Sequence, residues 1–326
     1  MKLLWIIHGY VPKLNAGAEN YTHNLNKYLN AQGHQIKVLI PREYTGLKNE
    51  SGEFEGINIV ITDEELERRK LVEWCDIVLT HLDFASITIN YIQNNRPIVY
   101  VAHNTFFHAY DYLKNKKNVF IIYNSLHASK ITPFENEYAV LRPPITAKRT
   151  VMNPEKNKYI TLINMNENKG GKVLKMLAER MPEYKFMGVK GSYGEQIEQP
   201  RCVKIHKNTA DITEVYEQTR LILMPSAYES WGMVASEACI NGIPVISSEA
   251  FGLKENLDYA GTILSGDLIK WKKAIELYDN ESIYKQKSEQ GLKRAEELIK
   301  MNEKELDDVN MFLNKIYYKF LMGELK

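Results

Sequence analysis

The fold is decided by residues 220–248, RLILMPSAYESWGMVASEACINGIPVISS, which contain two strand-like runs with a helix-like segment between them. RLILM is an apolar run of strand length, and IPVISS is a second one. The intervening segment begins at Trp231 and ends near Gly242, a residue type that often follows the last turn of a helix. A strand, a helix and a second strand in this order form a crossover between parallel strands, so the stretch predicts an α/β fold.

The same alternation extends over most of the chain. Amphipathic, helix-length segments separate the apolar runs LLWII, IKVLI, INIVI, DIVLT, PIVYVA and NVFIIY, and after AVLRPPITAKRT the rhythm restarts with YITLI, YKFMGV and CVKIH. The paired prolines mark a break, so we expect two Rossmann-like α/β/α domains, residues 1–144 and 145–302, joined near residues 141–150.

The end of the chain has a different pattern. From Asp267 onward it lacks strand-like runs and is rich in Lys, Glu and Leu, which predicts helices. A final helix at 303–326 has one broad apolar face made of Leu306, Val309, Phe312, Leu313, Ile316 and Phe320. Packing against the first domain and contact with a second chain would both explain this face.

Composition excludes several classes of protein. The 326 residues are 44% hydrophobic and 25% charged, and no apolar run approaches the roughly 18 residues that span a bilayer. LLWII is shorter than the apolar core of a secretory leader, and we expect it to form the first strand. Three scattered cysteines without a CxxC argue against disulfides or a zinc site, so a cytoplasmic location is expected.

Charge is balanced in both halves. Residues 1–144 contain 15 Lys and Arg against 15 Asp and Glu, which leaves 27 against 26 for the remainder of the 42 and 41. Neither half therefore has the basic excess of a nucleic-acid-binding protein. The runs ERRK at 67–70 and KNKK at 114–117 could make peripheral contact with anionic lipid, or could be solvated helix ends.

Ligands of parallel sheets bind outside the carboxyl ends of the strands, so the residues after each strand are candidates. Gly17 lies before the first helix, which we expect to end at Gly33, and it would let a phosphate or sugar approach the amides of that helix. An ordinary turn is the alternative. His103 follows PIVYVA and is a catalytic or a structural histidine, whereas His108 is expected to be structural.

Two further segments of the second domain follow strands. YITLINMNENKGGKVLKM predicts a strand, a loop with Lys169 beside two glycines, and a helix; it lacks the P-loop pattern. Glu229 is expected in the loop before the next helix and Glu237 about two turns later, with the amides of Gly232, Met233 and Val234 between them at the helix start. Alternatively, Glu229 caps the helix and Glu237 is an exposed helix residue.

Taken in order, these motifs resemble those of retaining glycosyltransferases of the GT-B fold, family 4 type (glycosyl transferases group 1). The resemblance is carried by AGAENYTHNLNKYLNAQGHQIKVL, YVAHN, NSLHASK, LRPPI, KGG and MPSAYESWGMVASEACINGIPVISSEAFGLKENL, and it covers most of the chain. It implies two domains facing across a cleft, with the acceptor in the first, a nucleotide-sugar donor in the second, and the C-terminal helix crossing back to the first.

The resemblance also implies roles for single residues. Glu229 would contact the donor sugar, Glu237 the ribose, and Lys169 the leaving diphosphate, while His103 would reach the donor sugar. The amides of Gly232, Met233 and Val234 would bind the sugar and diphosphate, with Gly17 near the same phosphates. Two positions depart from the family: Asn164 replaces an arginine that neutralises the diphosphate, and Ala16 replaces a glycine. Lys172 or Lys190 could substitute for that arginine.

The chain contains no Asp-x-Asp, so we expect transfer without a metal ion or other cofactor. The resemblance implies retention, and we expect front-face attack because the first-domain motifs contain no evident carboxylate nucleophile. The donor is expected to be a UDP- or GDP-sugar, whereas the acceptor could be a saccharide, lipid, protein or modified base in nucleic acid, and the oligomeric state is open. A non-catalytic nucleotide-sugar-binding subunit is the alternative from another class of protein, favoured only by Asn164.

Overall fold

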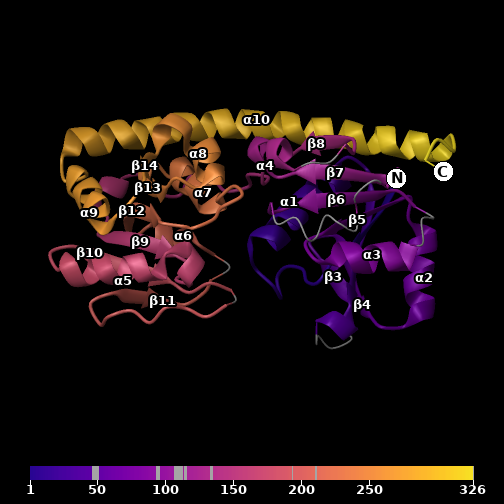
Figure 1. Ribbon diagram of the computed structural model, residues 1–326, viewed down its shortest axis with the longest axis horizontal. Helices are drawn as coiled ribbons and strands as arrows, with labels where there is room; N and C mark the ends of the chain where they lie inside the picture. The colour runs from indigo at the N-terminus through magenta and orange to yellow at the C-terminus, as the bar shows by residue number, and fades with distance from the viewer. Residues whose placement is uncertain are drawn as a thin grey trace. The chain divides into compact units, whose positions relative to one another are not determined.

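The computed structural model describes residues 1–45, 51–92, 96–105, 113, 116–132, 135–192, 194–209 and 211–325. The chain forms two compact units, residues 1–144 with 302–326 and residues 145–301 (Figure 1). Each unit contains a parallel sheet with helices on both faces, which confirms the predicted α/β class. His108 and Lys114 lie outside the described residues.

Within its described residues, the first unit has an eight-stranded sheet in the order β3-β4-β2-β1-β5-β6-β7-β8. Neighbouring strands are parallel except for β3, which is antiparallel to β4. The strands are β1 Lys2–Ile6, β2 Gln35–Pro41, β3 Gly52–Phe54, β4 Ile57–Thr62, β5 Ile77–His81, β6 Ile98–Ala102, β7 Val119–Tyr123 and β8 Tyr138–Val140. The helices are α1 Gly17–Ala31, α2 Glu65–Trp74, α3 Phe84–Ile92 and α4 Leu126–Ile131, with a 3₁₀ turn at Arg42–Tyr44.

Alternating residues of the central strands face two separate cores. Leu3 and Trp5 of β1 belong to the core that α1 covers, whereas Leu4 and Ile6 belong to the core covered by α2 and α3. This period of two is what an extended strand imposes when both faces of a sheet are buried. It explains why the strands are continuous apolar runs in the sequence.

The last helix, α10, spans Glu281–Leu321 and is longer than predicted. The predicted helix at 303–326 is its second half, because no proline interrupts the helical pattern after Glu281. Val309, Leu313 and Ile316 are fully buried in the core shared with α1. The apolar face therefore packs within the first unit, as one of the two alternatives predicted.

A buried polar anchor fixes this part of α10 to the end of the first unit's chain. The Arg142 guanidinium forms an ion pair with Glu305, whose carboxylate also accepts the Arg142 backbone N–H at 2.9 Å. Asn302 donates its amide to the Arg142 carbonyl at 3.0 Å. All three residues are at most 8% exposed. Burial strengthens these hydrogen bonds and makes the loss of either partner costly.

The second unit has a six-stranded parallel sheet, among its described residues, in the order β11-β10-β9-β12-β13-β14. The strands are β9 Tyr159–Ile163, β10 Lys185–Val189, β11 Lys204–His206, β12 Thr219–Met224, β13 Val245–Ser248 and β14 Thr262–Leu264. The helices are α5 Gly171–Arg180, α6 Thr213–Tyr216, α7 Met233–Ile240, α8 Phe251–Leu257 and α9 Leu268–Leu277, with 3₁₀ turns at Pro154–Lys156, Glu167–Lys169 and Asp258–Ala260. Helices α5 and α9 cover one face, and α7 and α8 cover the other.

Every predicted strand is present, and three further strands, β3, β8 and β14, were not predicted. Each of these three has only three residues, too few to show a hydrophobic period.

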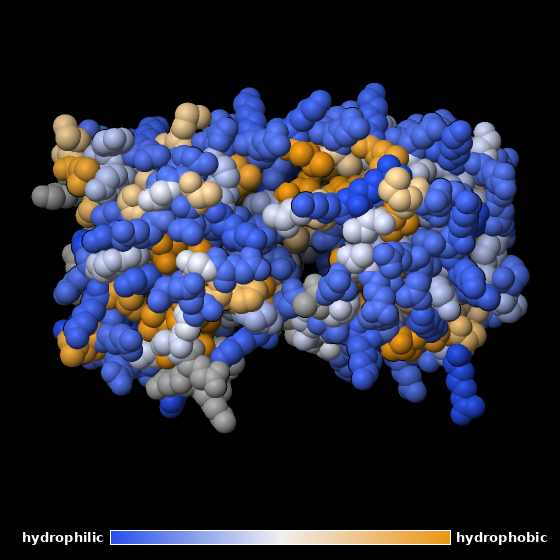
Figure 2. Space-filling model, turned by 180° about the vertical axis from the view of Figure 1, so that it is seen from behind, coloured by the Kyte–Doolittle hydropathy of each residue, from blue (hydrophilic) through white to orange (hydrophobic). Residues whose placement is uncertain are grey.

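The face shown in Figure 2 is largely hydrophilic, with smaller hydrophobic areas between charged and polar side chains. In the part of the chain that the structure describes, every helix is too short or too polar to cross a membrane.

Candidate functional site

The candidate site residues of the second unit surround the point where the strand order reverses. β9 is paired with β10 on one side and β12 on the other, so the chain winds outward in both directions from the β9–β12 pair. Lys169 follows β9 and Glu229 follows β12. Ligands of doubly wound sheets bind outside the carboxyl ends of strands at such a switch point. The topology therefore brings together residues that are 60 positions apart.

Lys169 and Glu229 form an ion pair at this edge. The Lys169 Nζ donates to Oε1 of Glu229, which also accepts from the Ser226 hydroxyl at 3.4 Å. The side chains are 31% and 11% exposed, respectively, so the pair is accessible mainly from the lysine. Glu229 does not cap α7, because the N-cap of that helix is Gly232 and it has no side-chain hydrogen bond. The capping interpretation was therefore wrong.

Close contact between the two loops holds the lysine in place. Gly170 has a φ of +92° and lies so near Pro225 that a Cβ would be 2.2 Å from the proline Cγ. The Ala227 N–H donates to the Asn168 carbonyl at 2.8 Å, and the Asn166 side chain accepts from the Lys169 N–H at 2.9 Å. Only glycine combines this backbone conformation with this approach.

The start of α7 is held by a buried asparagine that sequence reasoning missed. Gly232 is the N-cap and Met233 the first residue of the helix, as predicted, with Val234 next. The Asn256 side chain, fully buried, donates to the carbonyls of Trp231 and Gly232 at 3.2 and 2.9 Å. The first amides of a helix have no partner within the helix, and amides in this position favour an anion. The signal was a polar residue on the apolar side of FGLKENL.

Glu237 lies about one turn after Met233 in α7 and is half-buried, so it is not the exposed helix residue of the alternative interpretation. The Tyr216 hydroxyl donates to its Oε2 at 2.6 Å. Burial raises the pKa of the Glu237 carboxyl, and the Tyr216 hydrogen bond opposes that rise. Among the described side chains, none donates to Oε1.

The presence of asparagine at position 164 has a local structural reason. Its φ of +68° lies in the left-handed region, which asparagine tolerates better than most residues. Its Oδ1 accepts from the Asn166 N–H at 3.2 Å and the Gln196 amide at 3.3 Å. The side chain therefore holds the loop after β9, and its contact with a donor stays a prediction.

Gly17 and His103 belong to the first unit. Gly17 is the first residue of α1, and the helix ends as predicted with Gly33 at a φ of +85°. His103 directly follows β6 and is half-buried, with its ring edge-on to Tyr21 at 4.9 Å between centroids. Burial lowers the pKa of His103 to about 3, with a smaller effect from His8, so the ring is neutral at pH 7.

Sequence reasoning missed two histidines beside His103. His81 ends β5 and is fully buried, and its Nδ1 lies 3.1 Å from Nε2 of His103. His8 follows β1, and its Nε2 forms an ion pair with the Glu19 carboxylate at 3.0 Å. Burial lowers the pKa of His81 well below its usual value. The available signal was a histidine at the end of each of three apolar runs. It was not sufficient, because the sequence does not show that these three strands are neighbours in the sheet.

Comparisons with known proteins give a family match for part of the chain and a fold for the whole chain. Residues 194–304 match the model of glycosyl transferases group 1. No curated protein matches the sequence. Among solved structures, a sucrose-phosphate synthase from Thermosynechococcus elongatus is similar with a TM-score of 0.76 and 13% identity, over 98% of this chain and 100% of that one.

Two other structures are similar over nearly their full length. HepE of Anabaena, in complex with UDP and glucose, has a TM-score of 0.74 and 16% identity over 95% of this chain and 100% of its own. WaaG, a glycosyltransferase involved in lipopolysaccharide biosynthesis, has a TM-score of 0.68 and 15% identity over 94% and 98%. Residues 194–304 are therefore similar to the glycosyl transferases group 1 family, and the chain as a whole has the GT-B fold that these solved structures share.

Proposed function

We propose that this protein transfers a sugar from a nucleoside-diphosphate sugar to an acceptor, with retention of anomeric configuration and without a metal ion on the diphosphate. The Lys169–Glu229 pair at the switch point of the second unit, beside the first amides of α7, is the observation that carries the proposal. One site then holds a cation and amide donors for phosphate, together with a carboxylate for sugar hydroxyls.

Departure of the nucleoside diphosphate places negative charge on a phosphate oxygen while positive charge grows at the anomeric carbon. Lys169 and the amides of Gly232, Met233 and Val234 are aimed in advance, so they stabilise this charge more in the transition state than in the ground state. Glu229 orients the lysine and accepts from sugar hydroxyls, and Glu237 accepts from the ribose through Oε1. His103, neutral at pH 7, offers a hydrogen bond to the donor sugar from the first unit.

The donor is a UDP- or GDP-sugar in this proposal, which the UDP and UDP-glucose complexes of HepE support. The acceptor is a saccharide, lipid or protein. The balanced charge of residues 1–144 disfavours a base in nucleic acid, and a steep fall of binding with salt would reverse that preference.

The first test is a thermal-shift panel of UDP-, GDP-, ADP- and dTDP-sugars. A donor present at about a hundred times its dissociation constant stabilises the protein by about 2.7 kcal/mol. One nucleotide series is expected to raise the melting temperature well above the others. The absence of a shift with every nucleotide sugar would refute the proposal.

The second test uses variants of the proposed site with a matched control. Lys169→Ala and Glu229→Ala proteins that still fold are expected to lose transfer or donor hydrolysis by about 100-fold or more. Lys204→Ala is the control, because Lys204 is an exposed lysine of the same unit at the amino end of β11. Transfer should not require added Mg²⁺ or Mn²⁺, and strict dependence on manganese would contradict this mechanism. Binding without turnover would instead identify the non-catalytic alternative.

A further inference from the structure

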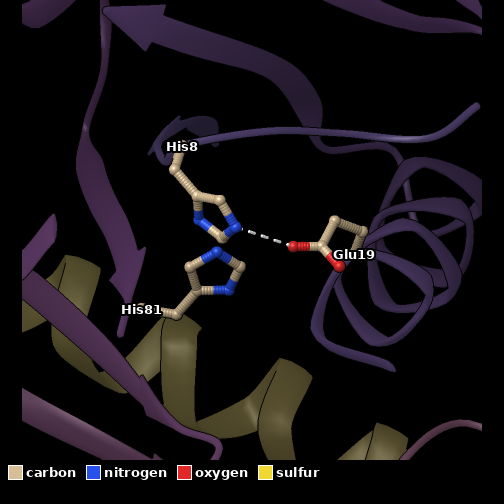
Figure 3. A group of neighbouring side chains, drawn as sticks. All are labelled: His8, Glu19 and His81. Carbon is tan, nitrogen blue, oxygen red and sulfur yellow. Dashed lines mark ion pairs between the residues drawn. The ribbon is translucent and has the colours of Figure 1, made fainter. Parts of the chain in front are cut away.

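Three side chains with metal-ligating atoms converge in the first unit. His8 follows β1, Glu19 lies in the first turn of α1, and His81 ends β5. One ligand atom from each lies within 4.8 Å of the other two. Among the described residues, these three form the group of His, Cys, Asp or Glu side chains that is close enough to hold a metal ion. Figure 3 shows the His81 ring directed at the His8–Glu19 pair.

Two buried atoms of this group lack partners. Glu19 is 2% exposed and His81 is fully buried. Neither Oε2 of Glu19 nor Nε2 of His81 has a hydrogen-bond partner among the described residues. A buried polar atom without a hydrogen-bond partner destabilises a fold. Two such atoms in one cluster indicate that a bound species completes it.

The sheet topology independently marks this position as a ligand site. β1 is paired with β2 on one side and β5 on the other, so the β1–β5 pair is the switch point of the first unit. His8 and His81 occupy the carboxyl ends of these two strands. This is the place in a doubly wound sheet where ligands bind.

We propose that His8, Glu19 and His81 bind one divalent transition-metal ion, with Zn²⁺ as the ion that best fits the donor set. Two imidazole nitrogens and one carboxylate oxygen are a common zinc ligand set, with a further position for water. Zinc–ligand distances are about 2.0–2.2 Å, so the three side chains must draw together. His8 can supply this movement because its side chain is 30% exposed, while Glu19 and His81 are held by burial.

Binding of the ion would fix the proton on the opposite nitrogen of His81. The orphaned Nε2 would hold the metal, so Nδ1 would carry the proton and donate to Nε2 of His103 at 3.1 Å. The ion would also neutralise Glu19, whose carboxylate lies in the same first helical turn as Gly17. This second effect rests on the proposed function, whereas the metal site itself does not.

Zn²⁺ binding to the full chain tests the site directly. After treatment with EDTA and desalting, the protein is titrated with ZnCl₂ against a chelating dye, and Co²⁺ is added separately to record its visible absorption. We expect one ion per chain and a cobalt spectrum of a nitrogen and oxygen site. Glu19→Gln and His8→Asn are each expected to weaken Zn²⁺ binding by at least about 100-fold.

His23→Asn is the matched control. His23 also pairs with a glutamate, because its Nε2 lies 3.3 Å from Glu55, but Lys27 occupies the same carboxylate oxygen at 2.6 Å. Its Zn²⁺ affinity should equal that of the wild type. Unchanged affinity in His8→Asn and Glu19→Gln, an equal loss in His23→Asn, or less than stoichiometric binding would each overturn the proposal. His8→Asn keeps the test decisive if Glu19→Gln fails to fold, and donor binding that survives the zinc-binding defect separates this site from the proposed function.

Discussion

Replacement of Gly252 by alanine tests whether the loop after β12 sets the donor site. A Cβ on Gly252 would lie 2.3 Å from the Ser230 carbonyl carbon and 2.5 Å from both its oxygen and the Trp231 nitrogen. These are backbone atoms, which cannot move aside as a flexible side chain can. The Gly252 N–H also donates to the Glu229 carbonyl at 3.1 Å. The loop that carries Glu229 must therefore move in the variant.

The expected size of the effect follows from two opposing terms. Overpacking costs about 1–3 kcal/mol, and the contact distances place this site at the upper end of that range. Replacement of glycine in a helix returns at most about 1 kcal/mol. The net destabilisation is about 2 kcal/mol, which lowers the melting temperature of a domain of this size by about 4–8 °C.

Gly291→Ala is the matched control, because it makes the same substitution in α10 of the same unit. Its Cβ would be 3.6 Å from the nearest atom, the Cys239 Cα, which is an ordinary contact. Only the helix term remains, so this variant should melt about 2–4 °C higher than the wild type.

Calorimetry of both variants, followed by titration with the preferred nucleotide sugar, separates these cases. Gly252→Ala should lose stability and bind the donor more weakly, whereas Gly291→Ala should gain stability and bind it normally. A Gly252→Ala protein that melts and binds like the wild type would refute the argument that this contact positions the loop.

Three other changes have defined outcomes. Glu229→Gln frees Lys169 from its ion pair, so the free nucleoside diphosphate should bind more tightly while sugar transfer falls by about 100-fold; equal changes in both, measured by calorimetry and product analysis, would contradict this. Burial raises the pKa of Glu237, so its ionised form destabilises the fold as pH rises through that pKa, and Glu237→Gln should raise the melting temperature at pH 8. Protonation of Glu237 at low pH should weaken donor binding in the wild type, and Glu237→Gln should remove this pH dependence. Asn256→Ala removes the buried hydrogen bonds from this amide to the Trp231 and Gly232 carbonyls and should cost about 1–3 kcal/mol in a denaturant titration, where a loss under about 0.5 kcal/mol would show that water replaces the amide.

The sequence was sufficient for the parts of this fold that depend on local patterns. The strands have continuous apolar runs because both faces of each sheet are covered, and the ends of α1 and α7 are marked by glycines. Lys169 and Glu229 could be assigned to loops after strands because the apolar runs before them mark where those strands end. That they form an ion pair could not be predicted, because it depends on β9 and β12 being neighbours.

The residues that were missed depend on contacts between distant segments. Asn256 holds the Gly232 carbonyl from 24 positions away, and although its place on the apolar side of FGLKENL indicates burial, the sequence does not show which groups it contacts. The sequence around His81 predicts only the end of a strand. Its place in a candidate site depends on His8 and His103, which lie beside it. Sheet order, rather than secondary structure, was the information that the sequence lacked.

The two switch points differ in charge, and this difference favours the second unit for the anionic donor. At the second unit's edge, Lys169 and the first amides of α7 are positive groups, and Glu229 pairs with the lysine. At the first unit's edge, burial keeps His81 and His103 neutral, and the buried Glu19 carboxylate lies in the first turn of α1. A carboxylate already placed at a helix N-terminus opposes a second anion there, because both interact with the same positive end of the helix dipole. A diphosphate would therefore be disfavoured beside α1 unless a cation first neutralised Glu19, whereas the second unit can accept it with its own residues.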